Sequence, residues 1–308
     1  MENINASAIK VKDFRKTYGN FVAVDSVTFD VLQGEIFGLL GPNGAGKTSI
    51  LESLEGLRTP NGGSLQVAGV DPARESRKLQ SRIGVQLQSA GLPENITPNE
   101  AIKLICAYHS VAPRFDLLER LGLMEKRNAQ FCNLSTGQQR RLALALAIAH
   151  TPEIIFFDEP TAGLDVATRV ELHSVMRELQ KGGATIILAT HDMSEAEQLS
   201  DRIAILLNGR IVTIGTPMAI TASGSGLTKI SVRTQASCLS AQELTFPAVS
   251  QQSTKDEYNI YFSSDIGPTV SAIITYIESQ DDVLIDLRVE RPSLEDRFLE
   301  ITYDGAAR

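Results

Sequence analysis

The sequence has no tryptophan, few aromatic residues and only three cysteines. Cys106, Cys132 and Cys238 are widely spaced and match no zinc pattern, so we expect reduced thiols in a cytosolic protein. Long apolar runs are also missing, because the stretches at 142–149 and 203–207 fall far short of the roughly 18 residues that a membrane span requires. The N-terminus lacks a basic start followed by an apolar stretch, which argues against secretion.

The chain carries fewer basic than acidic residues. The 29 lysines and arginines are outnumbered by 37 acidic residues, and the formal net charge is −8. Neutralising nucleic-acid phosphates needs a local excess of Lys and Arg, so we expect no direct nucleic-acid partner. With 308 residues, of which 43% are hydrophobic, the chain is long and apolar enough to form more than one globular domain.

One glycine-rich motif stands out against these absences. Residues 41–48 read Gly-Pro-Asn-Gly-Ala-Gly-Lys-Thr and follow the apolar segment 35–40. Glycines let successive backbone N–H groups turn inward around phosphate oxygens, and a helix beginning near Lys47 points its positive end at the same anion. The motif predicts a nucleoside triphosphate site in which Lys47 reaches the terminal phosphates and the Thr48 hydroxyl binds magnesium. The expected contacts are Gly41, Asn43, Gly44, Ala45, Gly46, Lys47, Thr48 and Ser49.

Two acids end a second apolar segment. Residues 154–157, Ile-Ile-Phe-Phe, place Asp158 and Glu159 at the end of a buried strand. Ionised groups there need a positive partner to offset the loss of water, and phosphate-bound magnesium would supply one. We expect Asp158 to hold the metal, directly or through water, and Glu159 to orient or deprotonate the attacking water. Taken alone, the pair is equally well explained as a strand ending in solvated acids.

A further anion-binding pattern lies at 133–141, Asn-Leu-Ser-Thr-Gly-Gln-Gln-Arg-Arg. Ser135 stands where a helix cap would be, and the Gly137 backbone lies in the first turn, so the segment can bind an anion without a phosphate loop of its own. A plain Ser-capped helix is the alternative. One triphosphate does not need two such sites in one chain. The segment therefore suggests contact with the γ-phosphate held by another copy of the site.

The remaining segments predict an α/β core followed by a second, smaller domain. Apolar runs at 154–157 and 184–189 flank a helical stretch at 166–181, which indicates parallel strands joined by a right-handed crossover. The Leu-Ala alternation at 142–149 mimics a strand, but Ala and Leu are strong helix formers and we expect a helix. Further strands are expected at 9–13, 24–31, 65–67 and 82–88, and further helices at 49–57, 99–110 and 114–120.

Composition changes around 215–226, which is rich in Gly, Ser, Thr, Ala and Pro and marks the expected domain boundary. Beyond it, period-two alternation at 230–232, 258–262 and 283–289 predicts strands, and the spacing of apolar residues at 270–277 predicts a helix. A capping box at Ser293-Leu-Glu-Asp296 opens a last helix. These elements indicate a small α+β domain.

Together, the phosphate loop, the acid pair and the segment at 133–141 resemble the ATP-binding cassette (ABC) family. The family signature usually reads Leu-Ser-Gly-Gly-Gln, and here Thr136 takes the place of the first glycine. The resemblance covers about 8–217. It implies a P-loop NTPase fold of ABC type, with a parallel core sheet, an antiparallel β subdomain and a helical subdomain at about 91–150. The α+β domain at 227–308 follows, and dimer stabilisation, regulation and partner docking are all open as its role.

The resemblance also adds site residues, each of which would be an ordinary surface or structural residue in isolation. Gln88 would contact magnesium and water, Asp165 would lie at the dimer interface, and His191 would contact the γ-phosphate. Gln138 completes the signature with Ser135 and Gly137. Tyr18 would stack on adenine, with Phe14 or Phe21 as alternatives for that role.

The implied function is that of an ATP-hydrolysing subunit of an ABC exporter, dimeric and peripheral on the inner face of the membrane, with a separate transmembrane permease subunit. Residues 292–299 are similar to the tail of drug- and antibiotic-resistance exporters. One alternative is a soluble ABC protein acting on DNA or the ribosome, which would usually carry two cassettes or a long coiled coil. Another is a regulator without turnover, against which Glu159 argues.

Overall fold

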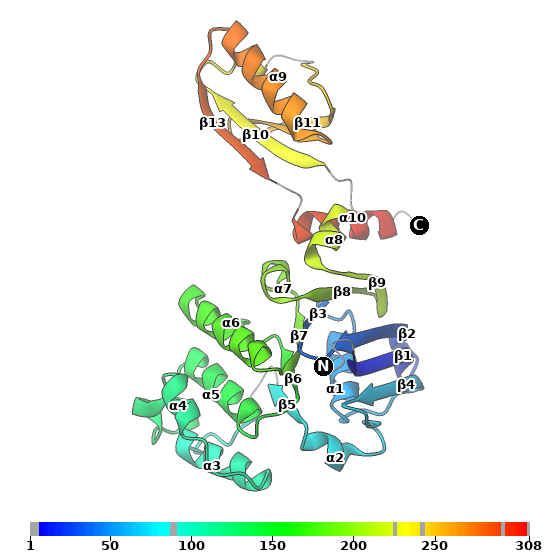
Figure 1. The fold of residues 1–308 in the computed structure, drawn as a ribbon, viewed down its shortest axis with the longest axis vertical. Coiled ribbons are helices and arrows are strands. Elements are labelled where there is room, and N and C mark those ends of the chain that lie inside the picture. Colours follow the sequence, from blue (N-terminus) through cyan, green and yellow to red (C-terminus); the bar gives the residue numbers. More distant parts are fainter. Residues whose placement is uncertain (1–5, 87–90, 224–226, 241–243, 291–292, 307–308) are drawn as a thin grey trace. The chain divides into compact units, whose positions relative to one another are not determined.

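The computed structural model describes residues 6–86, 91–223, 227–240, 244–290 and 293–306. The chain divides into two compact units, Met1–Pro217 and Met218–Arg308. The first unit contains a mixed sheet, an antiparallel sheet and a group of helices, whereas the second is built on one antiparallel sheet (Figure 1). The predicted α/β core sheet, antiparallel sheet and helical segment are all present in the first unit.

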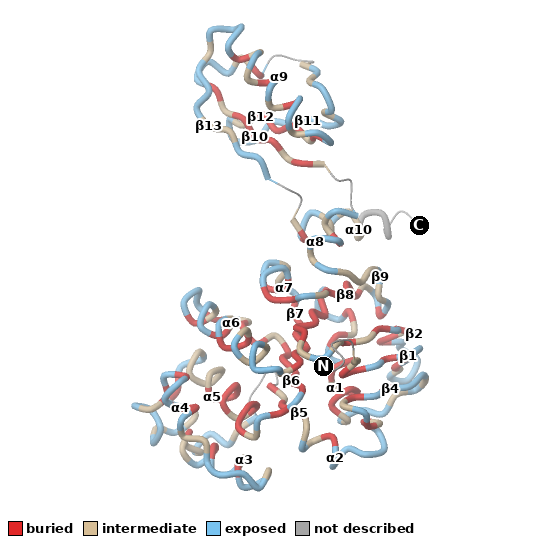
Figure 2. The backbone as a smooth tube through the Cα atoms, in the orientation of Figure 1, coloured by how far each residue is buried: buried red, intermediate tan, exposed pale blue. Residues whose placement is uncertain are grey.

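A six-stranded sheet forms the centre of the first unit, in the order β5-β6-β7-β3-β8-β9. All neighbouring strands are parallel except the β8–β9 pair. Every residue of the three central strands β6, β7 and β3 is buried (Figure 2), as expected for parallel strands covered on both faces. The strands are β3 (Ile36–Leu40), β5 (Ile83–Gln86), β6 (Ile154–Asp158), β7 (Thr185–Thr190), β8 (Arg202–Leu207) and β9 (Arg210–Gly215).

Helices connect these strands. The β6–α6–β7 unit is the parallel crossover that the sequence predicts. Because the carboxyl ends of parallel strands meet at one edge of a sheet, the loops that follow β3, β6 and β7 lie together. The helices of this part are α1 (Lys47–Leu54), α2 (Ser76–Gln80), α6 (Val166–Lys181) and α7 (Met193–Leu199).

A second, antiparallel sheet with the order β2-β1-β4 packs against the first. Gly19 and Asn20 form the predicted turn of its long hairpin. The two sheets share a core in which the rings of Phe29 and Phe37 stack with their centroids 5.3 Å apart. The strands are β1 (Ser7–Tyr18), β2 (Phe21–Leu32) and β4 (Gly62–Val67).

The segment at 91–150 is helical and has its own apolar cluster with the outer face of the core sheet. The Leu-Ala alternation lies in a helix, as predicted, and its Leu142 and Leu144 are fully buried. Thr97 and Glu100 form a capping box at the start of the preceding long helix. The elements are α3 (Pro98–Tyr108), α4 (Asp116–Arg120), η1 (Met124–Lys126), η2 (Phe131–Asn133) and α5 (Thr136–Ile148).

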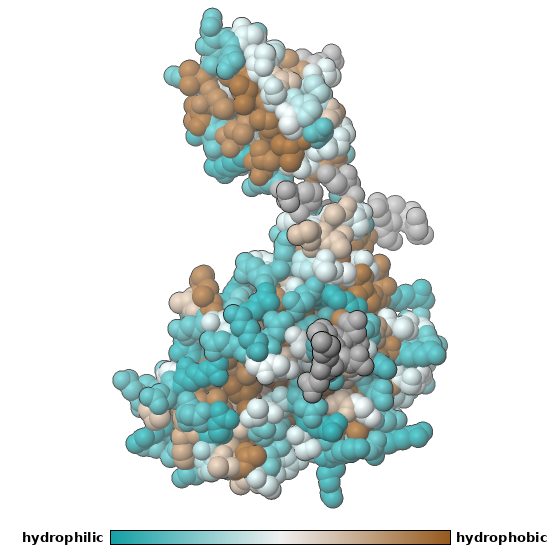
Figure 3. Space-filling model, in the orientation of Figure 1, coloured by the Kyte–Doolittle hydropathy of each residue, from teal (hydrophilic) through white to brown (hydrophobic). Residues whose placement is uncertain are grey.

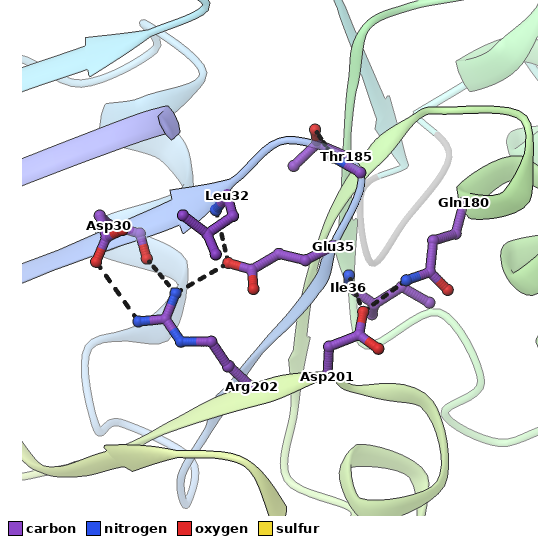
Figure 4. A network of polar contacts seen from close by, with 9 residues as sticks. Asp30, Leu32, Glu35, Ile36, Gln180, Thr185, Asp201 and Arg202 are labelled. Atoms are coloured by element: carbon purple, nitrogen blue, oxygen red, sulfur yellow. Dashed lines mark hydrogen bonds and ion pairs between the residues drawn. The ribbon is translucent and has the colours of Figure 1, made fainter. Parts of the chain in front are cut away.

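A polar network fixes the amino end of β3 (Figure 4). Arg202 donates to Glu35 Oε1 over 3.2 Å and also contacts Asp30. Asp201 Oδ2 accepts from the Ile36 backbone N–H at 2.8 Å. Burial raises the pKa of Glu35, while its bond to a backbone N–H and the Arg202 charge oppose that rise. These charges lie at the start of the strand, away from the loop that follows Leu40, and we assign them a structural role.

The second unit has a four-stranded antiparallel sheet in the order β11-β12-β10-β13, with α9 packed on it. Ser293 and Asp296 form the predicted capping box of the last helix. Strand β11 was not expected, because its sequence Val-Ser-Gln-Gln-Ser-Thr-Lys is polar and mostly exposed. The elements are α8 (Pro217–Ala222), β10 (Thr228–Thr234), η3 (Cys238–Ser240), β11 (Val249–Lys255), β12 (Tyr258–Ser263), α9 (Ile266–Ser279), β13 (Leu284–Glu290) and α10 (Leu294–Ala306).

Candidate nucleotide site

The glycine-rich loop joins β3 to the start of α1. Gly44 and Gly46 have φ values of +81° and +106°, a region that favours glycine. A Cβ atom at Gly41 would lie 2.3 Å from the Leu206 carbonyl oxygen, and one at Gly46 would lie 2.6 Å from that of Ala23. The loop therefore requires glycine for both conformation and space, and its backbone can approach a phosphate closely.

Lys47 is held inside this loop. Its Nζ donates to the carbonyl oxygens of Gly41 at 2.8 Å and Pro42 at 3.2 Å. Nζ also lies 3.7 Å from Glu159 Oε1, and both side chains are largely buried. Burial lowers the pKa of Lys47, and the charges of Glu159 and Asp158 oppose that effect. The lysine is thus positioned inside the glycine-rich loop, where an anion bound by the loop would lie.

Of the two predicted acids, Asp158 is the last residue of β6 and Glu159 follows it, and both lie beside the glycine-rich loop. Thr48 Oγ1 donates to Asp158 Oδ2 at 3.3 Å. The pKa of Asp158 is raised, first by burial and then by the Glu159 charge, while Thr48 and Lys47 lower it. A hydroxyl and a buried carboxylate that meet in this way, with more negative than positive charge around them, fit the oxygen ligands that magnesium prefers.

Glu159 connects the ends of two neighbouring strands. Its backbone N–H donates to the Ala189 carbonyl at 2.9 Å, and its φ of +48° lies in the left-handed region. Its Oε1 lies 3.0 Å from Nδ1 of His191, which follows β7. The start of α1, the end of β6 and the residue after β7 thus bring Lys47, Asp158, Glu159 and His191 together at one edge of the sheet.

Among the three aromatic residues considered for adenine stacking, Tyr18 has a direct contact with the loop. Its hydroxyl lies 3.3 Å from Ser49 Oγ, and its ring is 40% exposed. Phe14 is fully buried in the core, and Phe21 is 64% exposed beside Tyr18 in the hairpin. The cations of Lys16 and Arg58 lie 5.2 Å and 5.7 Å from the Tyr18 ring centre.

The segment at 133–141 begins α5 as predicted. Ser135 and Gln138 form a reciprocal capping box, with each side chain accepting from the other residue's backbone N–H. A Cβ atom at Gly137 would lie 3.4 Å from Thr168, which is hydrogen-bonded to Asp165 through Oγ1 at 2.9 Å. The pKa of Asp165 is lowered by its hydrogen bonds to Thr168. The start of α5, which carries Ser135 and Gly137, therefore lies beside the start of α6, which Asp165 caps.

One predicted site residue, Gln88, and one residue that the prediction missed, Arg140, remain to be placed. Gln88 lies outside the described residues, just beyond β5. Sequence reasoning missed Arg140, a half-buried cation on α5. Burial lowers its pKa, and the charges of Glu159 and Asp158 oppose that effect, so the guanidinium lies within electrostatic reach of the acid pair. In the sequence, only the position of Arg140 just after the Ser135–Gln138 signature could have pointed to a role at the site.

The fold and this loop define a P-loop nucleotide-binding protein of the ABC type. The sequence profile of the ABC transporter family matches residues 24–162. The daunorubicin resistance ATP-binding protein DrrA3 of Streptomyces coeruleorubidus is 33% identical over 307 residues, covering 97% of this chain and 96% of that protein. A Nod factor export ATP-binding protein I of Paraburkholderia xenovorans is 34% identical over 304 residues, covering 96% and 97%.

Solved structures of ABC cassettes align with about two thirds of this chain or slightly more. An ATP-binding subunit of an ABC transporter aligns with a TM-score of 0.65 and 28% identity, covering 70% of this chain and 92% of that one. A dimeric bacterial ABC transporter cassette aligns with a TM-score of 0.63 and 28% identity, covering 68% and 98%. A dimeric post-hydrolysis cassette bound to ADP and phosphate aligns with a TM-score of 0.63 and 26% identity, covering 68% and 98%.

The chain belongs to the ABC transporter family, as an ATP-binding subunit with ATPase activity. Within the residues that the structure describes, none of the helices combines the length and the apolar character needed to cross a bilayer.

Proposed function

We propose that this ABC ATPase drives an exporter as a dimer that encloses each ATP between two copies. The observation that carries the proposal is the division of the site into two halves. The phosphate loop gathers Lys47, Asp158 and Glu159, whereas Ser135 and Gln138 cap the separate helix α5 through bonds to each other. The loop side of one copy would face Ser135, Gly137 and Gln138 of the other. The dimeric cassettes with similar folds support this arrangement.

The residues on the loop side would divide the chemistry of hydrolysis. Lys47 would bind the terminal phosphates, and Thr48 and Asp158 would hold magnesium, which would offset phosphate charge when bound. Glu159 would accept a proton from the attacking water. His191 would orient that carboxylate through its Nδ1 contact at 3.0 Å and also reach the γ-phosphate. The roles of Gln88 at the water and magnesium, of Asp165 at the dimer interface and of Tyr18 on adenine complete the proposal.

Hydrolysis would then control the dimer. ATP contacts both copies only in the closed state, so binding favours closure in proportion to that difference in affinity. Conversion to ADP and phosphate removes the γ-phosphate link to Ser135. The closed and open forms would thereby alternate with ATP binding and hydrolysis, which is the motion that a membrane partner would receive.

A pocket in the first unit offers a docking surface for that partner. It has a volume of about 340 Å³ and lies between the end of α1, β5, α3 and α5. Leu57 and Tyr108 are 58% and 64% exposed at this pocket. A segment with apolar side chains would cover them. Because the pocket joins the α/β core to the helical part, a permease subunit bound there would sense their relative motion.

The relatives that align along nearly the whole chain support a proposal about export and location. Proteins named for daunorubicin resistance and for Nod factor export align along nearly the whole chain, including the second unit. We infer that this chain works on the cytoplasmic side of a membrane and moves a substrate outward. Substrate selection would belong to the permease subunit.

The Glu159→Gln variant tests the mechanism. We expect it to bind ATP normally, to release no phosphate above background and to accumulate as a dimer in saturating ATP and magnesium. Phosphate release and sedimentation velocity measure these outcomes. Glu153→Gln is a matched control, because Glu153 is an exposed acid just before β6. Normal phosphate release by Glu159→Gln, or a monomer in saturating ATP, would contradict the proposal.

Purification from membranes separates this function from that of a soluble ABC protein. The exporter subunit should retain a hydrophobic membrane protein and no nucleic acid. Retention of nucleic acid without a membrane protein would favour the alternative.

A further inference from the structure

Strand β13 lies at one end of the four-stranded sheet of the second unit. It ends the sheet order β11-β12-β10-β13 and, among the described residues, pairs with β10 alone. Its side chains Ile285 and Val289 are 51% and 42% exposed, and Leu284 is 37% exposed. Figure 3 shows apolar side chains gathered on the face of this unit that carries β13. An exposed apolar strand edge readily accepts another strand.

We propose that β13 pairs antiparallel with β13 of a second copy of this chain, joining the two C-terminal sheets across a twofold axis at Leu287. Leu287 is the middle residue of Leu284–Glu290, so this register pairs the whole strand. It sets Ile285 opposite Val289 of the other copy, and Asp286 opposite Arg288. Exposed apolar side chains and opposite charges are thus matched by the strand's own sequence.

Charge also selects this register over its neighbours. A slip of two residues in one direction places Asp286 opposite Asp286, and a slip in the other places Arg288 opposite Arg288. Like charges directly opposite each other destabilise strand pairs. A slip of one residue would turn every side chain to the wrong face. The favoured register is therefore also the one with the longest overlap.

The two charged side chains are already held in place within one copy. Asp286 Oδ2 accepts from the Tyr258 hydroxyl at 2.7 Å and from Arg288 Nε at 2.9 Å. The guanidinium of Arg288 also lies 5.1 Å from the Tyr258 ring centre. Because these contacts hold both side chains before association, less conformational entropy is lost when they meet the second copy.

The contact does not use nucleotide, and this distinguishes it from the proposed ATP-bound dimer of the cassettes. One strand pair buries far less than the roughly 1,200 Å² of a stable interface, so the isolated contact is weak. Held together at this strand, two copies would find each other more readily when ATP binds.

Charge reversal in the full-length chain tests the register. Sedimentation velocity without nucleotide, over a series reaching high micromolar concentrations, should show a reversible dimer of the natural sequence. Asp286→Arg and Arg288→Asp should each weaken it at least about tenfold, because each dimer contains the charge pair twice. Mixing the two variants, one of them tagged, should restore association, since each reversed charge then meets its opposite. Lys255→Glu on β11, the other edge strand, is the matched control and should associate normally.

Folding of the variants is checked by circular dichroism and by the ATP-dependent dimer of each in the Glu159→Gln background. Ile285→Lys is a second disruptive variant that leaves the Asp286 contacts intact. A monomeric natural chain without nucleotide would overturn the strand pairing, as would folded single reversals that associate normally or a mixture that stays monomeric. Loss of the ATP-dependent dimer in Glu159→Gln alone would instead count against the proposed function.

Discussion

Glu55 is a buried carboxylic acid at the end of α1, and its replacement by glutamine tests how burial sets the stability of the cassette. The residue is only 3% exposed, and its Oε2 has no hydrogen-bond partner among the described residues. Burial raises the pKa of Glu55 from 4.5 to about 8, with smaller contributions from the charges of Asp158 and Glu52.

The sign of the effect follows from proton binding. The unfolded chain releases this proton near pH 4.5, whereas the folded chain keeps it until about pH 8. Within that window the unfolded state binds fewer protons, so the free energy of unfolding falls as pH rises and levels off above the folded-state pKa. At roughly 1.4 kcal/mol per pKa unit, the raised pKa of Glu55 corresponds to a loss of about 3 to 4 kcal/mol between pH 5 and pH 8.

Urea unfolding of the natural chain and of Glu55→Gln, from pH 5 to pH 8, measures this loss. The amide does not titrate, so the variant should gain stability relative to the natural chain as pH rises, by an amount approaching that figure. Taking the difference between the two proteins cancels the other titrating groups. Glu119→Gln, at an exposed position on α4, should show no such trend. A constant difference between Glu55→Gln and the natural chain across this range would refute the reasoning.

Three further predictions concern the nucleotide loop and the docking surface. Lys47→Ala should weaken ATP binding by about 1.5–3 kcal/mol in calorimetric titration, with exposed Lys181→Ala unchanged; equal affinities would count against the loop. Gly46→Ala should lower both ATP affinity and the melting temperature, because the added Cβ would lie 2.6 Å from a carbonyl oxygen at a φ of +106°; a natural melting curve would show that the loop tolerates the methyl group. Tyr108→Glu should leave ATP hydrolysis by the isolated chain intact and reduce co-purification of the membrane subunit, and full retention of that subunit would move the docking surface elsewhere.

Local patterns predicted the parts of the fold that depend on local chemistry. The glycine spacing identified the loop before α1, and the apolar runs at β6 and β7 identified the crossover. The Leu-Ala alternation was correctly assigned to a helix because intrinsic propensity outweighed its period of two. Strand β11 escaped notice because it is a polar edge strand, and its only signal is its pairing with β12.

Contacts between distant segments could not be predicted. The sequence indicates that Asp158 and Glu159 end a strand, but the approach of Lys47 to Glu159 depends on how β3 and β6 are arranged in the sheet. Likewise, Glu55 resembles an ordinary surface acid at a helix end. Only its burial in the folded chain, together with the nearby charges of Asp158 and Glu52, raises its pKa.

The contact between Lys47 and Glu159 bears on how ATP hydrolysis would begin. Lys47 Nζ lies 3.7 Å from Oε1 of Glu159, the acid proposed to activate water. A triphosphate bound in the loop would compete for the same ammonium group, and the proposed base would then lose this partner. The proposed base would thereby stay paired with Lys47 until a triphosphate binds.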